Sequence, residues 1–165
     1  NKVPEIVKEY GNEFTVATVG TIKVTPHSVN VIPGTCTFSL EIRDQSAEVM
    51  KLIENHLRQL LEDICEKYGV TAAFVPTSYH DPAPMSELVR GTIEDAVKEL
   101  GIDYTVIPSG AFHDSLIMTS VFPTGMIFVP SKDGISHSRY EYTAPEDIEN
   151  GCNVLLNTVL KLDEK

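Results

Sequence analysis

The chain has 165 residues, 42% of them hydrophobic, which is enough to bury a core in one domain or in two small ones. Acidic residues outnumber basic residues by 24 to 13, and the formal net charge of -11 disfavours binding to phosphate backbones and anionic membrane surfaces. We therefore expect neither a nucleic-acid partner nor a membrane partner.

The three cysteines lie far apart in the sequence, with no C-x-x-C pair, at Cys36, Cys65 and Cys152. This spacing predicts neither a disulfide framework nor a cysteine-rich zinc site, and it favours a reducing cytoplasm. No apolar run approaches the roughly 20 residues that a membrane span needs, and the first residues lack the order of a signal peptide. We therefore expect a soluble, cytoplasmic protein.

The first residues of the chain read as the end of a helix. The segment from Val3 to Tyr10 is followed by Gly11, a typical helix stop, and the first residue is Asn1 rather than methionine. We expect the chain to be a piece of a longer protein.

Alternating apolar and polar residues predict strands over residues 14–24, with a bend at Gly20, and over residues 35–43. Pro33-Gly34 predicts a turn between them, because proline presets one dihedral angle and glycine accepts a positive one, so we expect a hairpin. The apolar side chains of the second strand share one face, which places Arg43 on the opposite, polar face.

The next segment has apolar residues at helical spacing. It predicts one long amphipathic helix from Ser46 to Tyr68, with Gly69 as its stop, and a further strand from Thr71 to Val75. The order strand, strand, helix, strand predicts a small α+β open-faced sandwich with the helix on one face of the sheet.

The stretch from His80 to Pro84 breaks every periodicity, because its prolines cannot lie inside a central strand or a helix. It predicts a domain boundary that divides the chain into residues 1–82 and 83–165.

The second part has the pattern of an α/β domain. Ser86 predicts the start of a helix that runs to Leu100 and ends at Gly101. Strands are predicted over 104–107 and 125–129 with a short helix after His113 between them, an order that implies parallel pairing. A capping box at Thr143-Ala144-Pro145-Glu146 predicts a last helix that buries Ile148, Val154, Leu155 and Val159.

The first candidate site, residues 109–114, follows the first of these two strands at the end where open α/β sheets bind ligands. Gly110 and Ala111 are small enough to let backbone N–H groups approach a substrate oxygen, and His113 can be oriented or charged by Asp114. His113 is thus a candidate catalytic residue. The alternative is a strand-to-helix turn in which His113 only caps the helix.

The second candidate site, residues 131–138, follows the second strand at the same edge. A neutral imidazole on a glycine-anchored loop is a good ligand for a divalent metal, so His113 and His137 could share a crevice. A catalytic zinc site usually takes three protein ligands, however, and no compact metal-site spacing is present. The alternative is that His137 only holds its neighbours by hydrogen bonds.

The third candidate site combines Asn30, just before the predicted turn, with Arg43 at the end of the following strand. The planar guanidinium of arginine suits a carboxylate, and an asparagine amide can both donate to and accept from an amide substrate. The alternative is that Asn30 satisfies turn backbone and that Arg43 pairs with Glu41 or Asp44 on the surface.

Motifs of other enzyme classes are absent from the sequence. It contains no G-x-S-x-G elbow, no Walker-type phosphate loop and no G-x-G-x-x-G segment. A serine hydrolase, a phosphate-loop nucleotidase and a Rossmann dehydrogenase are therefore disfavoured.

Taken together, several segments resemble the amidase branch of the zinc aminoacylase and carboxypeptidase superfamily, which includes N-carbamoyl-L-amino-acid hydrolase, allantoate amidohydrolase and beta-alanine synthase. The resemblance covers nearly the whole chain, and its strength lies in the order and spacing of the segments. These are Thr18-Val19-Gly20, Asn30-Val31-Ile32-Pro33-Gly34, Ile42-Arg43-Asp44, Pro108-Ser109-Gly110-Ala111 with His113-Asp114, Met126-Ile127-Phe128-Val129-Pro130-Ser131, and Gly134-Ile135-Ser136-His137-Ser138.

The resemblance implies a zinc-peptidase-like α/β catalytic domain with a smaller inserted sandwich, used as lid and dimerisation domain. Residues 1–82 would be most of the lid, and residues 83–165 the C-terminal section of the catalytic domain. By matching motif, Asn30 and Arg43 would grip the substrate, with Arg43 on its carboxylate. Gly110 and Ala111 would offer backbone contacts, and His137 would bind one of two metals.

The resemblance also implies two divalent metals per site, zinc, manganese or cobalt, with the other ligands and the general base earlier in the longer chain. We therefore expect hydrolysis of a linear amide or ureido bond of the N-carbamoyl-L-amino-acid or allantoate type, in an enzyme that this fragment alone cannot complete. The substrate would be a small amide with a carboxylate. We also expect a homodimer, because exposed lid strands can pair edge to edge.

Two alternatives stay open. The first is an aminoacylase or dipeptidase of the same superfamily, and the Asn30 and Arg43 pair favours the carbamoyl or ureido branch over it. The second is a binding or dimerisation module without catalytic activity.

Overall fold

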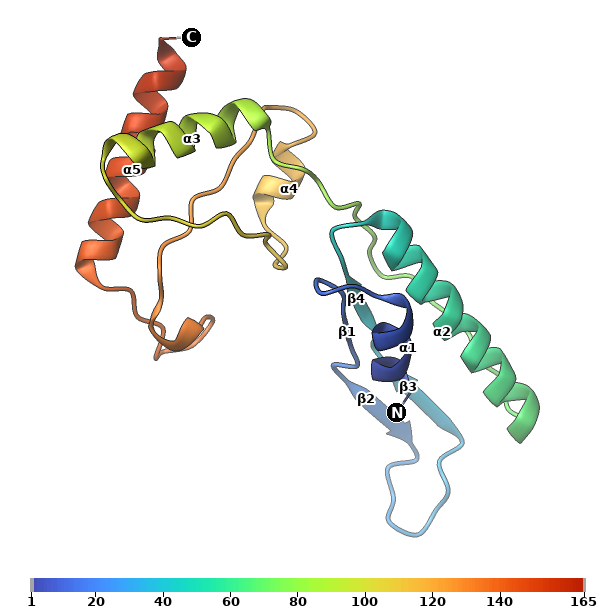
Figure 1. The fold of residues 1–165 in the computed structure, drawn as a ribbon. Helices are drawn as coiled ribbons and strands as arrows, with labels where there is room; N and C mark the ends of the chain where they lie inside the picture. The colour runs from blue at the N-terminus through green and yellow to red at the C-terminus, as the bar shows by residue number, and fades with distance from the viewer. Residues whose placement is uncertain (1, 165) are drawn as a thin grey trace. The chain divides into compact units, whose positions relative to one another are not determined.

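The computed structural model describes residues 2–164, which fold as two compact units divided between Pro82 and Ala83 (Figure 1). Residues 2–164 contain both helices and strands, and the four strands described there all lie in the first unit. No helix in the described part of the chain is long and apolar enough to cross a membrane.

The first unit begins with helix α1, which ends where the Gly11 N–H donates to the Val7 carbonyl oxygen at 2.8 Å. Four short strands follow, and a long helix closes the unit along the strands (Figure 1). The elements are α1 (Val3–Tyr10), β1 (Val16–Thr18), β2 (Ile22–Thr25), β3 (Thr35–Phe38), β4 (Glu41–Arg43) and α2 (Ala47–Tyr68).

The predicted hairpin is confirmed. Strand β2 pairs antiparallel with β3, and β1 pairs antiparallel with β4. The Gly34 N–H donates to the Thr25 carbonyl oxygen at 2.9 Å, which closes the loop between β2 and β3. The predicted strand over 35–43 is interrupted at Ser39, whose hydroxyl accepts a hydrogen bond from the Thr21 N–H at 3.0 Å.

The long helix α2 is confirmed at both ends. The Ser46 hydroxyl accepts a hydrogen bond from the Val49 N–H at 3.3 Å, and Gly69 ends the helix with a φ of +64°, a conformation that glycine adopts without strain. The buried hydrophobic side chains of this unit are Ile53 and Leu57, both on α2. They face the side on which α1 and β4 pack.

The predicted strand from Thr71 to Val75 is wrong. The segment has no ladder partner within residues 2–164, and a strand exists only where a neighbouring strand supplies hydrogen bonds. A cation–π contact ties the segment to α2 instead, with the Arg58 guanidinium 4.0 Å from the Phe74 ring centroid.

The second unit consists of α3 (Glu87–Glu99), α4 (Asp114–Met118), a short 3-10 turn η1 (Lys132–Gly134) and α5 (Pro145–Asp163). The predicted helix at Ser86 is confirmed, and Gly101 follows it with a φ of +67°. The core of the second unit lies between α3 and α5. Its buried residues are Thr92, Ala96, Val97, Val154 and Thr158.

The two parallel strands predicted over 104–107 and 125–129 are not formed, because neither segment has a ladder partner in the described part of the chain. The second segment is nevertheless packed closely by both helices. A Cβ added at Gly125 would lie 2.6 Å from Val89 Cγ1 on α3, and one added at Gly151 on α5 would lie 2.6 Å from Val129 Cγ1.

Helix α5 begins one residue later than the predicted capping box. Its N-cap is Ala144, with no side-chain cap bond, because the Thr143 hydroxyl instead bonds the Ser131 hydroxyl at 2.9 Å. Val154 is buried as predicted, but the other three side chains are not. Their exposed fractions are 49% for Ile148, 56% for Leu155 and 54% for Val159, because the helix turns a different stripe toward α3.

Candidate functional site

The segment 109–114 leads from an extended stretch into α4, a helix of five residues. His113 takes the N-cap position, but its side chain makes no cap hydrogen bond. Its imidazole instead packs edge-on against Phe128, with 5.8 Å between the ring centroids. The structure therefore brings the first candidate site into contact with the segment that leads into the second.

The backbone around Gly110 and Ala111 lies at the surface. A Cβ built at Gly110 would meet no atom within 4 Å, so the space beside this backbone is open. The Ser109 hydroxyl reaches the Ala111 carbonyl oxygen at 3.5 Å, the outer limit of a hydrogen bond. The predicted backbone contacts of Gly110 and Ala111 with a substrate stay a prediction.

The second candidate site is a loop whose neck is closed by hydrogen bonds. The Lys132 N–H donates to the Tyr142 carbonyl oxygen at 2.8 Å, directly beside the bond between the Ser131 and Thr143 hydroxyls. We call residues 131–143 the His137 loop.

His137 occupies an unusual backbone conformation in this loop, with a φ of +54°. A residue other than glycine in this region carries a cost of about 1 kcal/mol, and the surrounding bonds offset it. The His137 N–H donates to Glu141 Oε2 at 3.0 Å, and the Glu141 N–H donates to the Ser138 carbonyl oxygen at 3.0 Å. The backbone is thus held by hydrogen bonds, while the residue lies exposed at the surface.

The third candidate pair lies in the first unit. Asn30 is exposed in the loop between β2 and β3, where its Oδ1 accepts a hydrogen bond from the Ser28 hydroxyl at 2.8 Å. Arg43 ends β4 and pairs with Glu41, with 2.8 Å between Nη2 and Oε1. Asp44 accepts from the Thr15 hydroxyl at 2.5 Å and from the Ser46 N–H at 2.8 Å.

Of the two surface partners considered for Arg43, the structure therefore selects Glu41. Such an exposed pair contributes roughly 0–1 kcal/mol, so a substrate carboxylate can compete for the guanidinium. The predicted roles of Asn30 and Arg43 stay predictions.

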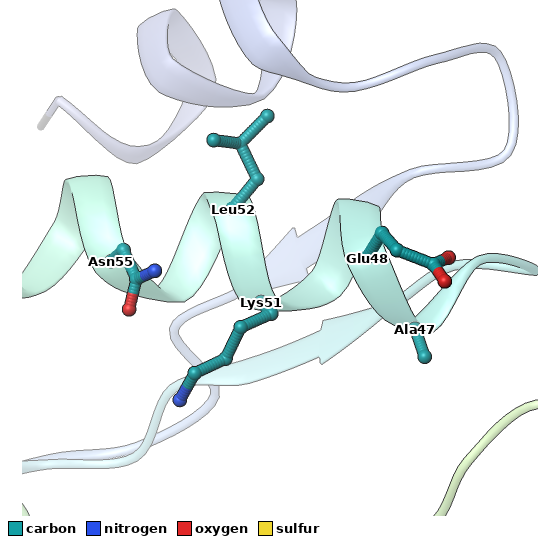
Figure 2. Close-up of a pocket in the computed structure, with 5 residues that line it drawn as sticks. All are labelled: Ala47, Glu48, Lys51, Leu52 and Asn55. Carbon is teal, nitrogen blue, oxygen red and sulfur yellow. The ribbon is translucent and has the colours of Figure 1, made fainter.

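The described residues also form shallow surface hollows, one on α2 and one in the His137 loop. The first, of about 460 Å³, lies on the outer side of α2 (Figure 2) and is lined by Ala47, Glu48, Lys51, Leu52 and Asn55. Figure 2 shows the Lys51 and Leu52 side chains pointing in opposite directions, so the lining groups do not converge on a ligand. The Ser46 hydroxyl and the helix backbone lower the pKa of Glu48, which belongs to the cap of α2.

The second hollow, of about 510 Å³, lies in the His137 loop and is lined by Lys132, Asp133, Ile135, Tyr140 and Tyr142. Tyr140 and Tyr142 were not among the site residues predicted from the sequence. Their spacing, Tyr-x-Tyr shortly after His137, was the available signal.

A metal site is not complete within the described residues. Among residues 2–164, no group of three or more His, Cys, Asp and Glu side chains could hold a metal ion. His137 alone does not make a catalytic metal site, which usually takes three protein ligands.

Residues 6–161 match the model of peptidase family M20/M25/M40, and the chain belongs to this family. The predicted resemblance, and with it membership of a family of hydrolases, is confirmed.

Named relatives act on the predicted bond types. The chain is 38% identical over 148 residues to the N-carbamoyl-L-amino acid amidohydrolase of Geobacillus stearothermophilus, covering 90% of this chain and 36% of that protein. It is 34% identical over 145 residues to the allantoate amidohydrolase of Bacillus subtilis, covering 88% of this chain and 35% of that protein. The chain thus spans little more than a third of the length of these relatives.

Solved structures agree. The crystal structure of AtUAH in complex with (S)-hydroxyglycine superposes with a TM-score of 0.90 at 32% identity, covering 99% of this chain and 39% of that chain. An amidase of the hydantoinase/carbamoylase family from Burkholderia multivorans gives a TM-score of 0.86 at 35% identity, covering 96% and 38%. The mixed helix and strand content of the predicted fold class is confirmed.

Proposed function

We propose that the chain is part of a metal-dependent amidohydrolase that cleaves a linear amide or ureido bond, with N-carbamoyl-L-amino acids or allantoate as substrates. The named relatives support the reaction class. The structural observation that supports it most is the His137 loop, which holds the backbone of an exposed histidine through Glu141.

In this proposal the two units have different tasks. Residues 1–82 form the lid and dimerisation domain, in which Arg43 binds the substrate carboxylate and Asn30 binds the amide. Residues 83–165 form part of the catalytic domain, in which the backbone at Gly110 and Ala111 contacts the substrate and His137 binds metal. The exposure of these residues supports such roles, because each is accessible to a small ligand.

The metal part of the proposal needs residues beyond these. Two divalent ions per site, zinc, manganese or cobalt, require more ligands than His137, so we place the remaining ligands in sequence outside the 165 residues. We expect the chain alone to bind metal weakly and to hydrolyse nothing. His113 stays a candidate catalytic residue through its position next to Phe128.

We also propose a homodimer formed by edge-to-edge pairing of lid strands such as β3 and β4. Their apolar side chains support this, since Phe38 is 47% exposed. Light scattering that shows only monomers at high protein concentration would contradict it. A cytoplasmic location, based on cysteine spacing, stays a prediction.

The test compares the 165-residue chain with a longer protein that contains it, each supplied with zinc, manganese or cobalt. The substrates are N-carbamoyl-L-amino acids, allantoate, N-acyl amino acids and dipeptides. We expect hydrolysis of the first two by the longer protein only. Turnover by the chain alone, or a preference of the longer protein for dipeptides, contradicts the proposal.

The metal role of His137 has its own test in the longer protein. His137→Ala is expected to lower the bound metal measured by elemental analysis and to reduce kcat, whereas the exposed His27→Ala is the matched control and changes neither. Equal metal content in the two variants would remove His137 from the ligand set.

A further inference from the structure

The chain directly after Arg43 is fastened by one carboxylate. The Asp44 Oδ2 accepts a hydrogen bond from the Thr15 hydroxyl. Its Oδ1 accepts hydrogen bonds from the Ser46 N–H at 2.8 Å and from Asn12 Nδ2 at 3.2 Å. We call these three bonds the Asp44 clamp. The clamp ties the end of β4 to the segment before β1 and to the N-cap of α2.

The bond between Thr15 and Asp44 continues the ladder of β1 and β4. The last ladder pair is Val16 with Arg43, so Thr15 and Asp44 are the next residues opposite each other. Side chains alternate between the two faces along a strand. Accordingly, Thr15 is buried, with 8% exposed, whereas the Arg43 side chain is 45% exposed. The clamp therefore lies on the face of the strands opposite the Arg43 side chain.

The Thr15 side chain has little room to move. A Cβ added at Gly11 would lie 2.8 Å from both Thr15 Cβ and Thr15 Oγ1, so the end of α1 packs closely on this side chain. The Thr15 hydroxyl also accepts a hydrogen bond from the Asn12 N–H at 2.8 Å. Because a carboxylate only accepts, the hydroxyl must donate to Asp44 while it accepts from Asn12. Its orientation is thus fixed from both sides.

On the exposed face, Glu41 directs the Arg43 guanidinium along β4. The Glu41 Oε1 accepts hydrogen bonds from Arg43 Nε at 3.0 Å and from Nη2 at 2.8 Å. The two residues lie two positions apart on one strand, so the direction of the guanidinium follows that of the β4 backbone. A planar guanidinium recognises a carboxylate through two parallel bonds, which require a defined orientation. A displaced strand end would therefore weaken carboxylate binding.

We propose that Thr15 is a positioning residue for recognition of the substrate carboxylate. Through the Asp44 clamp it holds the end of β4, and with it the Arg43 guanidinium, in the orientation that accepts the carboxylate. The inference rests on the proposed function, in which Arg43 binds that group. Thr15 itself does not touch the substrate. It acts on binding, because a group that is already oriented loses less conformational freedom when the ligand binds.

The kinetic test uses a longer protein that contains the chain. Thr15→Val is nearly isosteric but lacks the hydroxyl, and Thr15→Ser keeps it. The substrates are N-carbamoyl-L-phenylalanine and N-carbamoyl-L-phenylalaninamide, in which a neutral amide replaces the carboxylate. Where the amide is not hydrolysed, its inhibition constant as a competitor replaces its KM.

We expect Thr15→Val to raise KM for the carboxylate substrate about threefold to tenfold, the effect of losing roughly one hydrogen bond. Its kcat, and the constant for the amide, should stay within about twofold of the wild-type values, because only carboxylate binding is weakened. Thr15→Ser should behave like the wild type. A purely structural role of Thr15 would change both substrates alike.

The second test needs no activity. In the 165-residue chain, Arg43 and Arg58 each donate from Nε to a glutamate, so their Nε–Hε NMR signals report on two guanidinium groups of the same unit. We expect Thr15→Val to shift and broaden the Arg43 signal and to leave the Arg58 signal unchanged. Thr37→Val is the matched control, because it removes a hydroxyl from the other ladder, opposite Lys23, and it should change neither signal.

Unchanged amide signals of α2 show that each variant is folded. Asn12→Ala serves if Thr15→Val does not fold, because Asn12 is exposed and its side chain supplies another bond of the clamp. It should change the same Arg43 signal and the same KM in the same direction, by a smaller factor.

An unchanged Arg43 signal in a folded clamp variant overturns the proposal, as does an equal loss of affinity for the carboxylate and amide compounds. Failure of the proposed function is distinguishable. If the longer wild-type protein hydrolyses neither compound, the amidohydrolase is rejected. The Arg43 signal of the chain, titrated with the same two compounds, then decides whether Thr15 controls carboxylate binding. Hydrolysis together with an unchanged Arg43 signal keeps the amidohydrolase and rejects the positioning role.

Discussion

Two glycines lie inside helices of the second unit, and their surroundings differ. Gly91 in α3 has no atom within 4 Å of an added Cβ, whereas an added Cβ at Gly151 in α5 would lie 2.6 Å from Val129 Cγ1. Glycine in a helix interior costs roughly 1 kcal/mol relative to alanine, so the helix preference alone favours alanine at both positions. Packing against Val129 must therefore decide whether alanine at position 151 stabilises or destabilises the second unit.

We predict that Gly91→Ala stabilises the second unit by up to about 1 kcal/mol. Gly151→Ala is expected to destabilise it by about 1–2 kcal/mol, because valine is stiff at χ1 and overpacking typically costs about 1–3 kcal/mol. Urea unfolding followed by the amide signals of α3 and α5 measures both changes. A stabilising Gly151→Ala would mean that Val129 moves away from α5 at little cost.

Individual residue types predicted part of the candidate site, but not all of it. The sequence indicated exposed loops at Gly110 and His137, and the structure brings their flanking segments together at His113 and Phe128. The sequence alone did not show whether Arg43 pairs with Glu41 or with Asp44. The Asp44 carboxylate accepts a hydrogen bond from the Thr15 hydroxyl, which is 29 positions away in the sequence, and Arg43 pairs with Glu41.

At the scale of elements, helix α2 carries an ion-pair cluster around Glu54. Its carboxylate lies 3.0 Å from Lys51 Nζ and 2.6 Å from Arg58 Nη2, and its side chain is 28% exposed. The hydrogen bonds from Lys51 and Arg58 lower the pKa of Glu54 below its ordinary value of 4.5. Folding therefore favours the ionised carboxylate.

A carboxyl group with a lowered pKa stabilises the folded state above the pKa of the unfolded chain, near 4.5. We predict that Glu54→Gln lowers the free energy of unfolding by about 0.5–1 kcal/mol above that pH. The difference disappears as the pH falls through the lowered pKa of the folded state. Urea unfolding at a series of pH values, followed by the amide signals of α2, measures it.

Glu62→Gln, on the same helix, is the matched control, since Glu62 forms no ion pair within residues 2–164. It should give no comparable pH-dependent loss. A constant difference between wild type and Glu54→Gln down to the lowest pH would show that the ion pairs do not cause it.

Helices and strands also differ in how well the sequence predicts them. The starts of α2 and α3 follow from Ser46 and Ser86, and their ends follow from Gly69 and Gly101, because helix signals are local. The strands predicted over 71–75, 104–107 and 125–129 need partners that no local pattern supplies. Helix α5 is a similar case. The spacing of its apolar residues predicts a helix, but it does not show which of those residues pack against α3.

At the scale of the whole molecule, the segments over 104–107 and 125–129 lead to a last prediction. Their sequences favour strands, yet their backbone N–H groups donate no hydrogen bond within residues 2–164. Amide hydrogen exchange reports directly on such bonds. In the 165-residue chain we expect fast exchange in both segments and slow exchange around Ala96 in α3 and Val154 in α5, where the helices pack on each other.

Slow exchange of both segments in the chain would contradict this structure, because the strands would then pair with each other or with a second copy. The same measurement on a longer protein, of the length of the relatives, separates local from non-local causes. Protection that arises only there would show that neighbouring strands, and not the apolar pattern of these segments, complete the sheet beside Gly110 and the His137 loop. Because both loops follow these segments, the ordering of the sheet would then fix the geometry of the proposed site.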